Sequence, residues 1–401
     1  MPFTKTFIPY GCYWTTPFAR WQGSFSHLHP MRFCAEIGVR MMAEKKISPE
    51  IFDTVVFGTT VPSKSCFYGA PWVAAMMGAV GATGPMIGQA CATSAKCLET
   101  AAREIECGDT KTSLVVTADK CSNGPHLYYP NPQGPGGTGD QENWVWDNFG
   151  HDPWALNAMI ETAENVAREE KVSKEEQDDI TVLRYQQYQK ALDGDRAFQK
   201  RYMVAPIEVK DASGRKVVAT VKGDEGAFPT SKEGLAKLKP VKQGGTVSFG
   251  TQTFPADGNA CMVLTTKEKA REMSFNKAVT IQVLSYGQAR TKKGFMAKAI
   301  VPAARTALER AGVAIKDVGA IKTHTPFAVN DVYFCREFGL KWEQMNNYGC
   351  SLIYGHPQGP TGLRTTMELI EELVLLGGGY GLFDGCAAGD TGAAIVIKVE
   401  V

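Results

Sequence analysis

The sequence predicts an α/β fold of two similar halves, in which buried sheets lie between layers of helices. Near residue 100, an amphipathic helical segment precedes a short strand of apolar, β-branched residues, and the same order recurs near residue 370. The chain has 401 residues, which is enough for two or three domains that each bury a core. A repeated α/β unit in a chain of this length is typical of stacked helix and sheet layers.

In the N-terminal half, one helix and one strand are predicted from their apolar patterns. Residues 94–107 carry small or apolar side chains at intervals of three and four, and Gly108 provides a helix stop. These side chains are Ala95, Leu98, Ala101, Ala102 and Ile105. Residues 112–118, TSLVVTA, predict a buried strand. The uncharged residues 65–95 contain so many glycines and prolines that they predict a buried, tightly packed segment rather than a membrane span.

A segment of different composition separates the two halves. Residues 125–153 are rich in Pro, Gly, Asn and aromatic side chains, and residues 210–242 are rich in Lys and Gly. Between them, residues 157–192 predict helix, with a break before the capping pair Ser173 and Glu176. The three expected domains are an N-terminal half of residues 1–124 and 245–272, an inserted loop domain of residues 125–244, and a C-terminal half of residues 273–401.

The C-terminal half contains the second copy of the helix and strand pattern. Residues 301–311 and 362–376 have the apolar spacing of helices. Residues 318–323, 379–383 and 393–399 are short apolar runs that predict strands. The two halves therefore carry comparable α/β units.

Charge and cysteine content narrow the classes of function. Lys and Arg number 43 against 42 Asp and Glu, so the net charge of +1 offers no general field that would attract nucleic acid or an anionic membrane. The eleven cysteines include no CxxC pair, and the first residues, MPFTKTFIPYGCYW, lack the pattern of a signal peptide. We therefore expect a cytoplasmic protein with free thiols.

Cys91 is the first candidate for chemistry. It lies in GQACATSAK, immediately before the predicted helix, where backbone N–H groups and the helix dipole favour a thiolate. A thiolate at that position would be a nucleophile near neutral pH. The alternative is that Cys91 packs as a small apolar side chain.

Three further candidates lie on Gly-rich loops or at a strand end. His356 in YGHPQGPTG could act as a base or hydrogen-bond donor, although a turn residue bonded to backbone is equally compatible. Cys386 in FDGCAAGDTGAA lies in an expected tight turn whose N–H groups could receive an oxyanion. His324 in KTHTPFAVND follows a predicted strand, where α/β folds place ligands, although it could also be a core histidine.

A metal site is the weaker interpretation of the remaining histidines and cysteines. One group contains two sulfur and two imidazole ligands in 23 residues: Cys12, His27, His29 and Cys34. Its spacing matches no paired-ligand zinc pattern, so we expect no metal in this chain.

Taken together, five segments resemble the thiolase family over nearly the whole chain. They are Cys91 at its helix start, TAENVAREEKVSKEEQDDITVLRYQQYQKAL from residue 162, GTVSFGTQTFPADGNA from residue 245, YGHPQGPTG around His356, and GCAAGDTGAA around Cys386. The resemblance implies two βαβαβαβ halves in a five-layer α/β/α/β/α core with an inserted loop domain. It implies an acyltransferase that uses coenzyme A as a substrate and needs no metal or redox cofactor.

The resemblance also assigns roles to the candidate residues. Cys91 would take the acyl group as a thioester, and His356 would activate it and donate to the thioester oxygen of the second substrate. Cys386 would exchange a proton with the α-carbon of acetyl-CoA. The backbone N–H groups of Cys91 and of the turn after Cys386 would form an oxyanion hole. Thr253 aligns with a serine that contacts pantetheine, and Gly389 lies in the turn expected to bind the substrate.

Two departures from the family pattern concern the oxyanion holes. Residues 324–327 read HTPF where common thiolases have NEAF, which is similar to the HDCF motif of the sterol-carrier-protein type. His324 is the candidate replacement for the asparagine. Ala388 stands where the family motif CxG has glycine. These departures leave open a catalytically inactive, thiolase-like scaffolding subunit. A condensing enzyme of the ketoacyl-synthase or hydroxymethylglutaryl-CoA-synthase type is the other alternative, although such enzymes do not use a second cysteine like Cys386.

Substrate and partners are inferred from the insertion and from the resemblance. Seven lysines of the insertion offer a local cationic surface for the phosphates of coenzyme A: Lys210, Lys216, Lys222, Lys232, Lys237, Lys239 and Lys242. The aromatic segment from Tyr128 to Trp154 could line a pocket for a bulky acyl chain or could pack the loop domain. The chain resembles thiolases of aromatic degradation, of the benzoylsuccinyl-CoA thiolase type. That branch implies a homodimer with a small partner that combines a zinc-binding element and an OB-fold.

Overall fold

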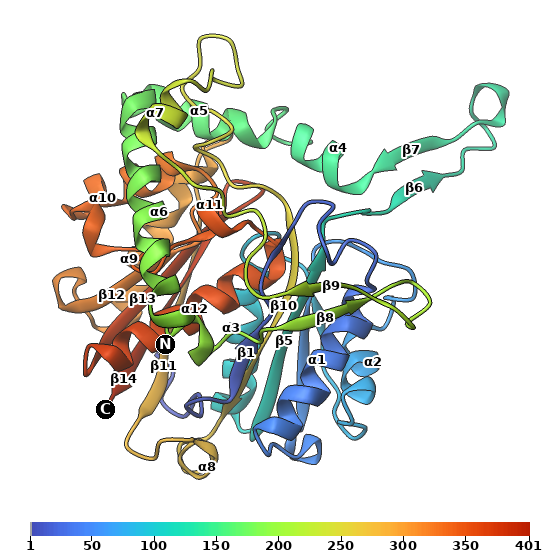
Figure 1. Cartoon of the computed structure of the whole chain (residues 1–401), viewed down its shortest axis with the longest axis vertical. Coiled ribbons are helices and arrows are strands. Elements are labelled where there is room, and N and C mark those ends of the chain that lie inside the picture. The colour runs from blue at the N-terminus through green and yellow to red at the C-terminus, as the bar shows by residue number, and fades with distance from the viewer. Residues whose placement is uncertain (1) are drawn as a thin grey trace.

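Two large β-sheets organise the chain, and the computed structural model describes residues 2–401 (Figure 1). The first sheet has six strands in the order β1-β10-β5-β3-β4, with β2 also beside β10. Its strands are β1 (Tyr13–Thr15), β2 (Ala19–Arg20), β3 (Thr54–Gly58), β4 (Met86–Ile87), β5 (Thr112–Lys120) and β10 (Ala256–Thr265). The second sheet has four strands in the order β11-β14-β13-β12. These are β11 (Thr280–Arg290), β12 (Val318–Thr323), β13 (Gly378–Ala387) and β14 (Thr391–Glu400).

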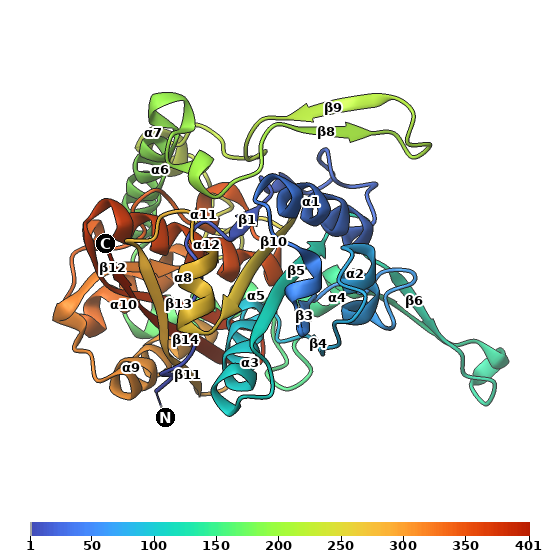
Figure 2. The same ribbon diagram turned by 90° about the horizontal axis from the view of Figure 1, so that it is seen from below.

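Two helices lie between the sheets, and other helices cover the outer faces (Figure 2). The central pair, α3 (Thr93–Cys107) and α12 (Gln358–Leu375), contact each other and strands of both sheets. On the outer face of the first sheet lie α1 (Pro30–Glu44) and α2 (Gly69–Met76). On the outer face of the second lie α9 (Ile300–Ala311) and α10 (Ala328–Phe338). The five-layer α/β/α/β/α order expected from the sequence is confirmed.

The central position of α12 explains its composition. Because sheets and α3 surround this helix, nearly all of its side chains are buried, including the polar ones. Buried charges are tolerated only when they are paired. Arg364 on α12 therefore forms ion pairs with Asp224 at 2.6 Å and with Glu368 at 3.0 Å.

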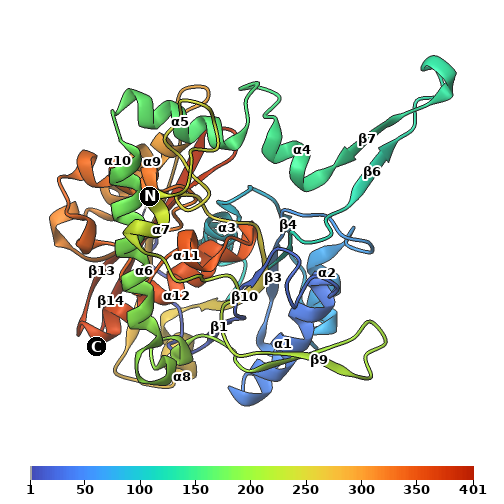
Figure 3. The ribbon, with the colours of Figure 1, turned by 45° about the horizontal axis from the view of Figure 1, so that its top comes forward.

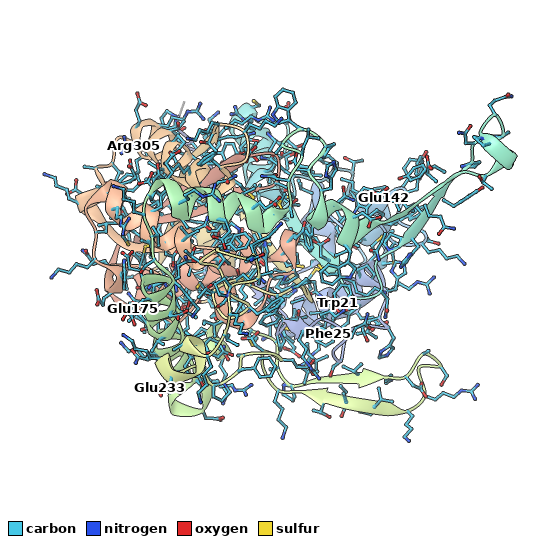
Figure 4. The ribbon with its side chains drawn as sticks, turned by 90° about the horizontal axis from the view of Figure 1, so that it is seen from above. Trp21, Phe25, Glu142, Glu175, Glu233 and Arg305 are labelled. Carbon is cyan, nitrogen blue, oxygen red and sulfur yellow. The ribbon has the colours of Figure 1, made fainter. Side chains whose placement is uncertain are left out.

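The insertion between the halves contains helices and two hairpins that join neither large sheet. Its helices are α4 (Trp144–Gly150), α5 (Met159–Glu169), α6 (Lys174–Arg196) and α7 (Lys232–Ala236). Its hairpins are β6 (His126–Tyr129) with β7 (Asp140–Asn143), and β8 (Ile207–Lys210) with β9 (Val217–Val221). The β6–β7 hairpin stands away from the body as an arm (Figure 3), and Glu142 marks it in Figure 4. In the β8–β9 arm, Ile207, Val209 and Val221 are buried in the core cluster that includes residues of α1.

Short elements complete the fold. The remaining α-helices are α8 (Lys267–Met273) and α11 (Ser351–Tyr354). The 3-10 turns are Pro49–Ile51, Pro135–Gly137, Gln199–Arg201, Met296–Ala299, Ile315–Asp317 and Trp342–Gln344. Among residues 2–401, no helix combines the length and the apolar character that crossing a membrane requires.

The strongest sequence predictions match these elements closely. The predicted strand over residues 318–323 is β12, and the predicted helix over residues 94–107 is α3, which ends at Gly108 with a φ of +85°. The helix break before Ser173 is also confirmed. The hydroxyl of Ser173 accepts from the N–H of Glu176 at 3.1 Å, and the Glu176 carboxylate accepts in return from the N–H of Ser173.

Two predictions of local structure are wrong. Residues 65–95 are not a uniformly buried segment: they form α2 and the edge strand β4 on the outside of the first sheet, where Phe67 and Val80 are each 82% exposed. Cys386 does not lie in a turn. Strand β13 extends to Ala387, so Cys386 pairs with Gly392 of β14, and the turn consists of the next three residues.

Candidate active site

Four side chains predicted from the sequence converge at one end of the central helices. Cys91 immediately precedes the first turn of α3, and His356 immediately precedes α12. His324 follows β12, and Cys386 lies near the end of the adjacent strand β13. The ligand atoms of Cys91, His324 and His356 lie within 4.8 Å of one another. The Sγ of Cys386 lies 4.0 Å from Nε2 of His324.

A tight turn presents the sulfur of Cys91. Ala90 has a φ of +43°, which an alanine adopts only when neighbouring contacts hold it there. Here the hydroxyl of Thr93 accepts from the N–H of Gln89 at 2.8 Å and donates to the carbonyl of Ala90 at 2.7 Å. The turn thus projects Cys91 from the start of α3.

Burial opposes the thiolate expected at this helix start. It raises the pKa of the Cys91 thiol to about 12, and the nearby carboxylate of Asp119 adds to the increase. The backbone N–H groups of Cys91 and Ala388 face the sulfur and lower its pKa, but by less than burial raises it. Cys91 is therefore a neutral thiol near pH 7, so it needs a base to become a nucleophile, and the sequence-based expectation of a resting thiolate is wrong.

His356 has the tautomer that a base requires. Thr361 donates its one hydroxyl hydrogen to the carbonyl of Pro357 at 2.6 Å, so it can only accept from Nδ1–H of His356 at 2.8 Å. Nε2 of His356 is consequently unprotonated, and it is buried with no hydrogen-bond partner among the described residues. Burial lowers the pKa of His356 to about 3, so the ring is neutral at rest.

His324 and Cys386 form the other side of the site. The His324 ring tilts toward His356, with 5.0 Å between ring centroids. Its burial and the neighbouring His356 hold the pKa of His324 well below its ordinary value. Burial also raises the pKa of the Cys386 thiol well above its ordinary value, while the amide of Asn330 donates to its sulfur at 3.2 Å. A Cβ on Gly385 would lie 2.7 Å from Nδ1 of His324, so only glycine leaves room for that ring.

Asp119 is a site residue that the sequence interpretation missed. It ends β5, and its buried carboxylate accepts from the N–H of Gly359 in the first turn of α12 at 2.6 Å. Its other oxygen accepts from the N–H of Thr60 at 2.7 Å and of Val61 at 3.2 Å. Asp119 therefore joins the loop after β3 to the start of α12. Its position at the end of a predicted strand was the signal that could have identified it.

Ala388 is compatible with the turn that carries it. Positive φ values fall on Gly389, at +79°, and on Asp390, at +58°, whereas Ala388 needs no such conformation. The departure from glycine thus leaves the Ala388 N–H pointing at the Cys91 sulfur. Gly389 lies one residue farther along the turn, and its carbonyl accepts from Nε of Arg290 at 3.1 Å.

The other predicted binding residues lie outside the cluster. Thr253 is half-buried, and its hydroxyl donates to the carbonyl of Ser351 at 2.6 Å. Along the chain, the lysines of the insertion fall into a group near the β8–β9 arm and a group around α7. In the second group, Lys242 pairs with Glu161 at 2.6 Å and Lys232 pairs with Asp179 at 2.8 Å.

The alternative metal ligands near the N-terminus do not assemble. Cys12 and Cys34 are buried, whereas Nε2 of His27 is bonded to the carbonyl of Lys210 and Nε2 of His29 to that of Lys64. Of the described residues, these four make no cluster of potential ligands.

Two cavities lie around the catalytic cluster. One of about 440 Å³ begins at Ala90 and Ala388, beside Cys91, and the aromatic side chains of Trp144 and Phe149 line it. Another of about 350 Å³ lies between the segment around α7 and the loop of residues 249–254, and Phe228, Phe249 and Phe254 are among its lining residues. The aromatic segment of the insertion therefore does line a pocket, as one of its two interpretations predicted.

Known proteins with the same fold share this organisation along the whole chain. Residues 14–268 match the family described as thiolase, N-terminal domain, and residues 277–399 match thiolase, C-terminal domain. Human mitochondrial 3-ketoacyl-CoA thiolase is 29% identical over 392 residues, which are 96% of each chain. Beta-ketothiolase BktB of Cupriavidus necator is 28% identical over 94% of this chain and 95% of its own.

Solved structures agree with the sequence comparisons. The crystal structure of human mitochondrial 3-ketoacyl-CoA thiolase in complex with CoA covers 99% of both chains with a TM-score of 0.89 and 27% identity. The acetyl-CoA acetyltransferase of Bacillus anthracis also covers 99% of both chains, with a TM-score of 0.90 and 25% identity. Because family matches span both halves and place Cys91, His356 and Cys386 within them, the chain belongs to the thiolase family of acyltransferases.

Proposed function

We propose that this chain catalyses the CoA-dependent thiolytic cleavage of a 3-oxoacyl-CoA, and the reverse Claisen condensation, through an acyl thioester on Cys91. The observation that carries the proposal is the convergence of a neutral thiol, an unprotonated imidazole nitrogen and a second thiol in one buried cluster. Cleavage between the α and β carbons needs a nucleophile, a base and a proton donor for the carbon that leaves.

In the first half-reaction, Nε2 of His356 takes the proton of Cys91 as the sulfur bonds to the β-carbonyl carbon. The negative charge that develops on the carbonyl oxygen lies near the N–H groups of Cys91 and Ala388. When the carbon–carbon bond breaks, its electron pair goes to the α-carbon, which takes a proton from the thiol of Cys386. Acetyl-CoA, or its equivalent, leaves.

In the second half-reaction, a CoA thiol gives its proton to the Cys386 thiolate and attacks the acyl group on Cys91. The carbon–sulfur bond to Cys91 breaks, and the proton held on His356 returns to its sulfur. Asn330 stabilises the Cys386 thiolate by donating to it. His324 lies where it can contribute, with His356, to holding the thioester oxygen of the substrate, in place of the asparagine of the common motif.

Two alternatives from other classes are less well supported. A ketoacyl-synthase or hydroxymethylglutaryl-CoA-synthase type of condensing enzyme gives no role to Cys386, which here lies in the cluster with His324 and Asn330. An inactive scaffolding subunit would follow from a distorted oxyanion hole, but Ala388 keeps its N–H directed at Cys91.

For the acyl group we propose a bulky chain, with the aromatic substrate benzoylsuccinyl-CoA, cleaved to benzoyl-CoA and succinyl-CoA, as the specific candidate. The cavity of about 440 Å³ beside Cys91, with Trp144 and Phe149 in its wall, supports a chain much larger than acetyl. The sterol-carrier-protein branch is proposed from His324 and the HTPF motif alone.

Coenzyme A is proposed to lie across the inserted loop domain of residues 125–244, next to Thr253 and Gly389. The apolar cavity around Phe228 and Phe249 supports this position, because the adenine and pantetheine parts of the coenzyme need apolar contacts beside charged ones for the phosphates. We also propose two flanking halves, residues 1–124 with 245–272 and residues 273–401. The two large sheets support this division, because each half contains the strands of one sheet.

We propose a homodimer formed through the outer edge of the first sheet. The edge strand β4 and the helix α2 expose large apolar side chains that a monomer leaves in water: Phe67, Tyr68, Trp72, Met76, Val80 and Met86. An unpaired strand edge beside such a patch is typical of an interface. The eleven free cysteines support a reducing compartment such as the cytoplasm.

A small partner with a zinc-binding element and an OB-fold is proposed from the family resemblance. The β6–β7 arm supports a docking role because Tyr128 and Tyr129 are about half exposed on it. Purification from the native host that yields only a fully active homodimer would contradict this partner.

Mass spectrometry of the intact chain tests the reaction. Incubation with a panel of aliphatic, branched and aromatic 3-oxoacyl-CoA thioesters should add one acyl group, which Cys91→Ser abolishes. Cys386→Ala should still accept acyl groups from simple thioesters while losing cleavage. A chain that gains no acyl mass with any member of the panel would support the scaffolding alternative, and normal turnover in Cys386→Ala would support the condensing enzyme.

A further inference from the structure

The catalytic cluster also has the composition of a metal site. Of residues 2–401, Cys91, His324 and His356 form the one group of three potential ligands whose donor atoms all lie within 4.8 Å of one another. The Sγ of Cys386 lies 4.0 Å from Nε2 of His324 but is not part of the group of three. Two sulfur and two imidazole ligands are a donor set typical of zinc.

The separations are close to those that a bound ion requires. Zn–S bonds of about 2.3 Å and Zn–N bonds of about 2.0–2.1 Å place tetrahedral donors roughly 3.3–3.8 Å apart. The observed upper separation of 4.8 Å therefore needs a contraction of the group by about 1 Å. The proposal requires the side chains of the group to move by that amount when the ion binds.

The imidazole of His356 is already in the form that binds a metal. Only an unprotonated ring nitrogen is a ligand, and Nε2 of His356 is unprotonated because Nδ1–H donates to Thr361. That nitrogen is buried with no hydrogen-bond partner in the described part of the chain. A ligand histidine whose other nitrogen is held by an outer partner is the usual arrangement at metal sites.

A cavity leads to one side of the buried cluster. Cys91 is only partly buried, and the cavity lined by Ala90 and Ala388 opens beside it. Thiolate and imidazole donors prefer borderline-soft ions such as Zn²⁺ to hard ions such as Mg²⁺. Binding would release the thiol protons of Cys91 and Cys386 to solvent, because the thiolate is the form that coordinates.

We propose that Cys91, His324 and His356, with Cys386 as the fourth donor, bind one Zn²⁺ ion and that this ion blocks the thiol that takes the acyl group. The metal is an inhibitor and not a cofactor, so the proposal goes beyond the acyl transfer reaction and is tested without substrate. His324 is the ligand that gives this chain the site, because the asparagine of the common motif offers no comparable nitrogen donor.

Equilibrium dialysis of the full-length chain against Zn²⁺ tests the proposal, with metal content measured per chain after removal of unbound ion. We expect one tightly held Zn²⁺ in the native protein and none with Mg²⁺. His324→Asn and Cys91→Ala should each weaken zinc binding by more than roughly 10–100-fold. That is the loss usually seen when a residue that hydrogen-bonds a metal ligand is removed, and these two changes remove a ligand itself. Co²⁺ should give a thiolate charge-transfer band in the native protein that loses intensity in Cys91→Ala and disappears when Cys386→Ala is added.

Matched controls use thiols and imidazoles outside the cluster. Cys107 is exposed and His29 is half-buried at the start of α1, outside the cluster, so Cys107→Ser and His29→Gln should retain the bound ion. A second measurement uses the native chain: Zn²⁺ should protect Cys91 from alkylation by iodoacetamide, and prior alkylation should prevent zinc binding. This measurement decides the question if a variant fails to fold.

Zinc that persists in both His324→Asn and Cys91→Ala, or that leaves when Cys107 or His29 is changed, would overturn the proposal. Unhindered alkylation of Cys91 in the presence of saturating Zn²⁺ would do the same. Because these readouts involve no thioester, a chain that binds zinc but accepts no acyl group would contradict only the proposed function.

Discussion

Replacing Thr361 with valine tests whether the tautomer of His356 limits acyl transfer. In the native chain, Thr361 accepts from Nδ1–H at 2.8 Å and donates to the carbonyl of Pro357 at 2.6 Å, which leaves Nε2 unprotonated. Valine keeps the shape of the side chain but removes the acceptor. Nδ1–H would then be a buried donor without a partner, and the ring would favour the tautomer with the hydrogen on Nε2.

The size of the effect follows from the cost of that unpaired donor. A buried, unsatisfied N–H costs about 1–3 kcal/mol. Because about 1.36 kcal/mol corresponds to a tenfold change, this cost lowers the population of the tautomer with an unprotonated Nε2 roughly 5- to 150-fold. Since only that tautomer can accept the proton of Cys91, acylation should slow by the same factor.

The assay is single-turnover acylation of Cys91 followed by intact mass, together with kcat/KM for cleavage. Thr361→Ser retains the hydroxyl and should stay within a few-fold of the native rate. Thr365→Val is the matched control on the same face of α12, because the Thr365 hydroxyl donates to the carbonyl of Thr361 at 2.7 Å and does not contact His356. Equal rates in Thr361→Val and the native chain, with both folded, would refute the assignment of His356 as a tautomer-locked base.

Three other changes address the second thiol, the carboxylate between the halves and a buried acid. Cys386→Ala should lower kcat for cleavage by about 10²–10⁴-fold, as expected for loss of a general acid, while acylation of Cys91 by a simple acyl thioester, measured by mass, persists; a loss of both would contradict separate roles. Asp119→Ala leaves the N–H groups of Thr60, Val61 and Gly359 without their acceptor. Urea unfolding should show that the free energy of unfolding falls by about 3 kcal/mol or more, and a fall below about 1 kcal/mol would refute this role. Burial raises the pKa of Asp384 well above its ordinary value. Above about pH 4 the folded chain therefore keeps a proton on this carboxyl group that the unfolded chain has released. The free energy of unfolding consequently falls as pH rises. Asp384→Asn removes that term, so its free energy of unfolding relative to the native chain should increase from pH 4 to pH 7, and a pH-independent difference would contradict the buried neutral acid.

The layered fold could be predicted from sequence because its central elements obey simple periodicities. Strand β12 and helix α3 were predicted nearly to the residue, since each has an unbroken apolar pattern and α3 has Gly108 at its end. The outer segment of residues 65–95 was mispredicted because apolar composition does not distinguish a face that packs inside the chain from one left at its surface.

The site was predictable in its members but not in its electrostatics. Cys91, His324, His356 and Cys386 were identified from their loops, strand ends and family motifs, and they converge. The direction in which the pKa of Cys91 shifts was not predicted. The sequence shows the helix start, which lowers this pKa, but the larger increase from burial arises only when both sheets close over the sulfur. Asp119 was missed for the same reason, since its partners come from two distant segments.

The position of α3 and α12 between the two sheets has a consequence for amide hydrogen exchange. Nearly all of α12 is buried between strands of both halves, so most of its N–H groups reach solvent only when the sheets separate, whereas Arg103 and Cys107 of α3 are exposed. We therefore expect the turns of α12 beyond the first to exchange as slowly as the most protected strands, because the first-turn N–H groups have no acceptor within the helix. In such an arrangement, we expect heating to abolish activity in the same cooperative step that unfolds the whole chain, without an earlier state that is partly opened and inactive.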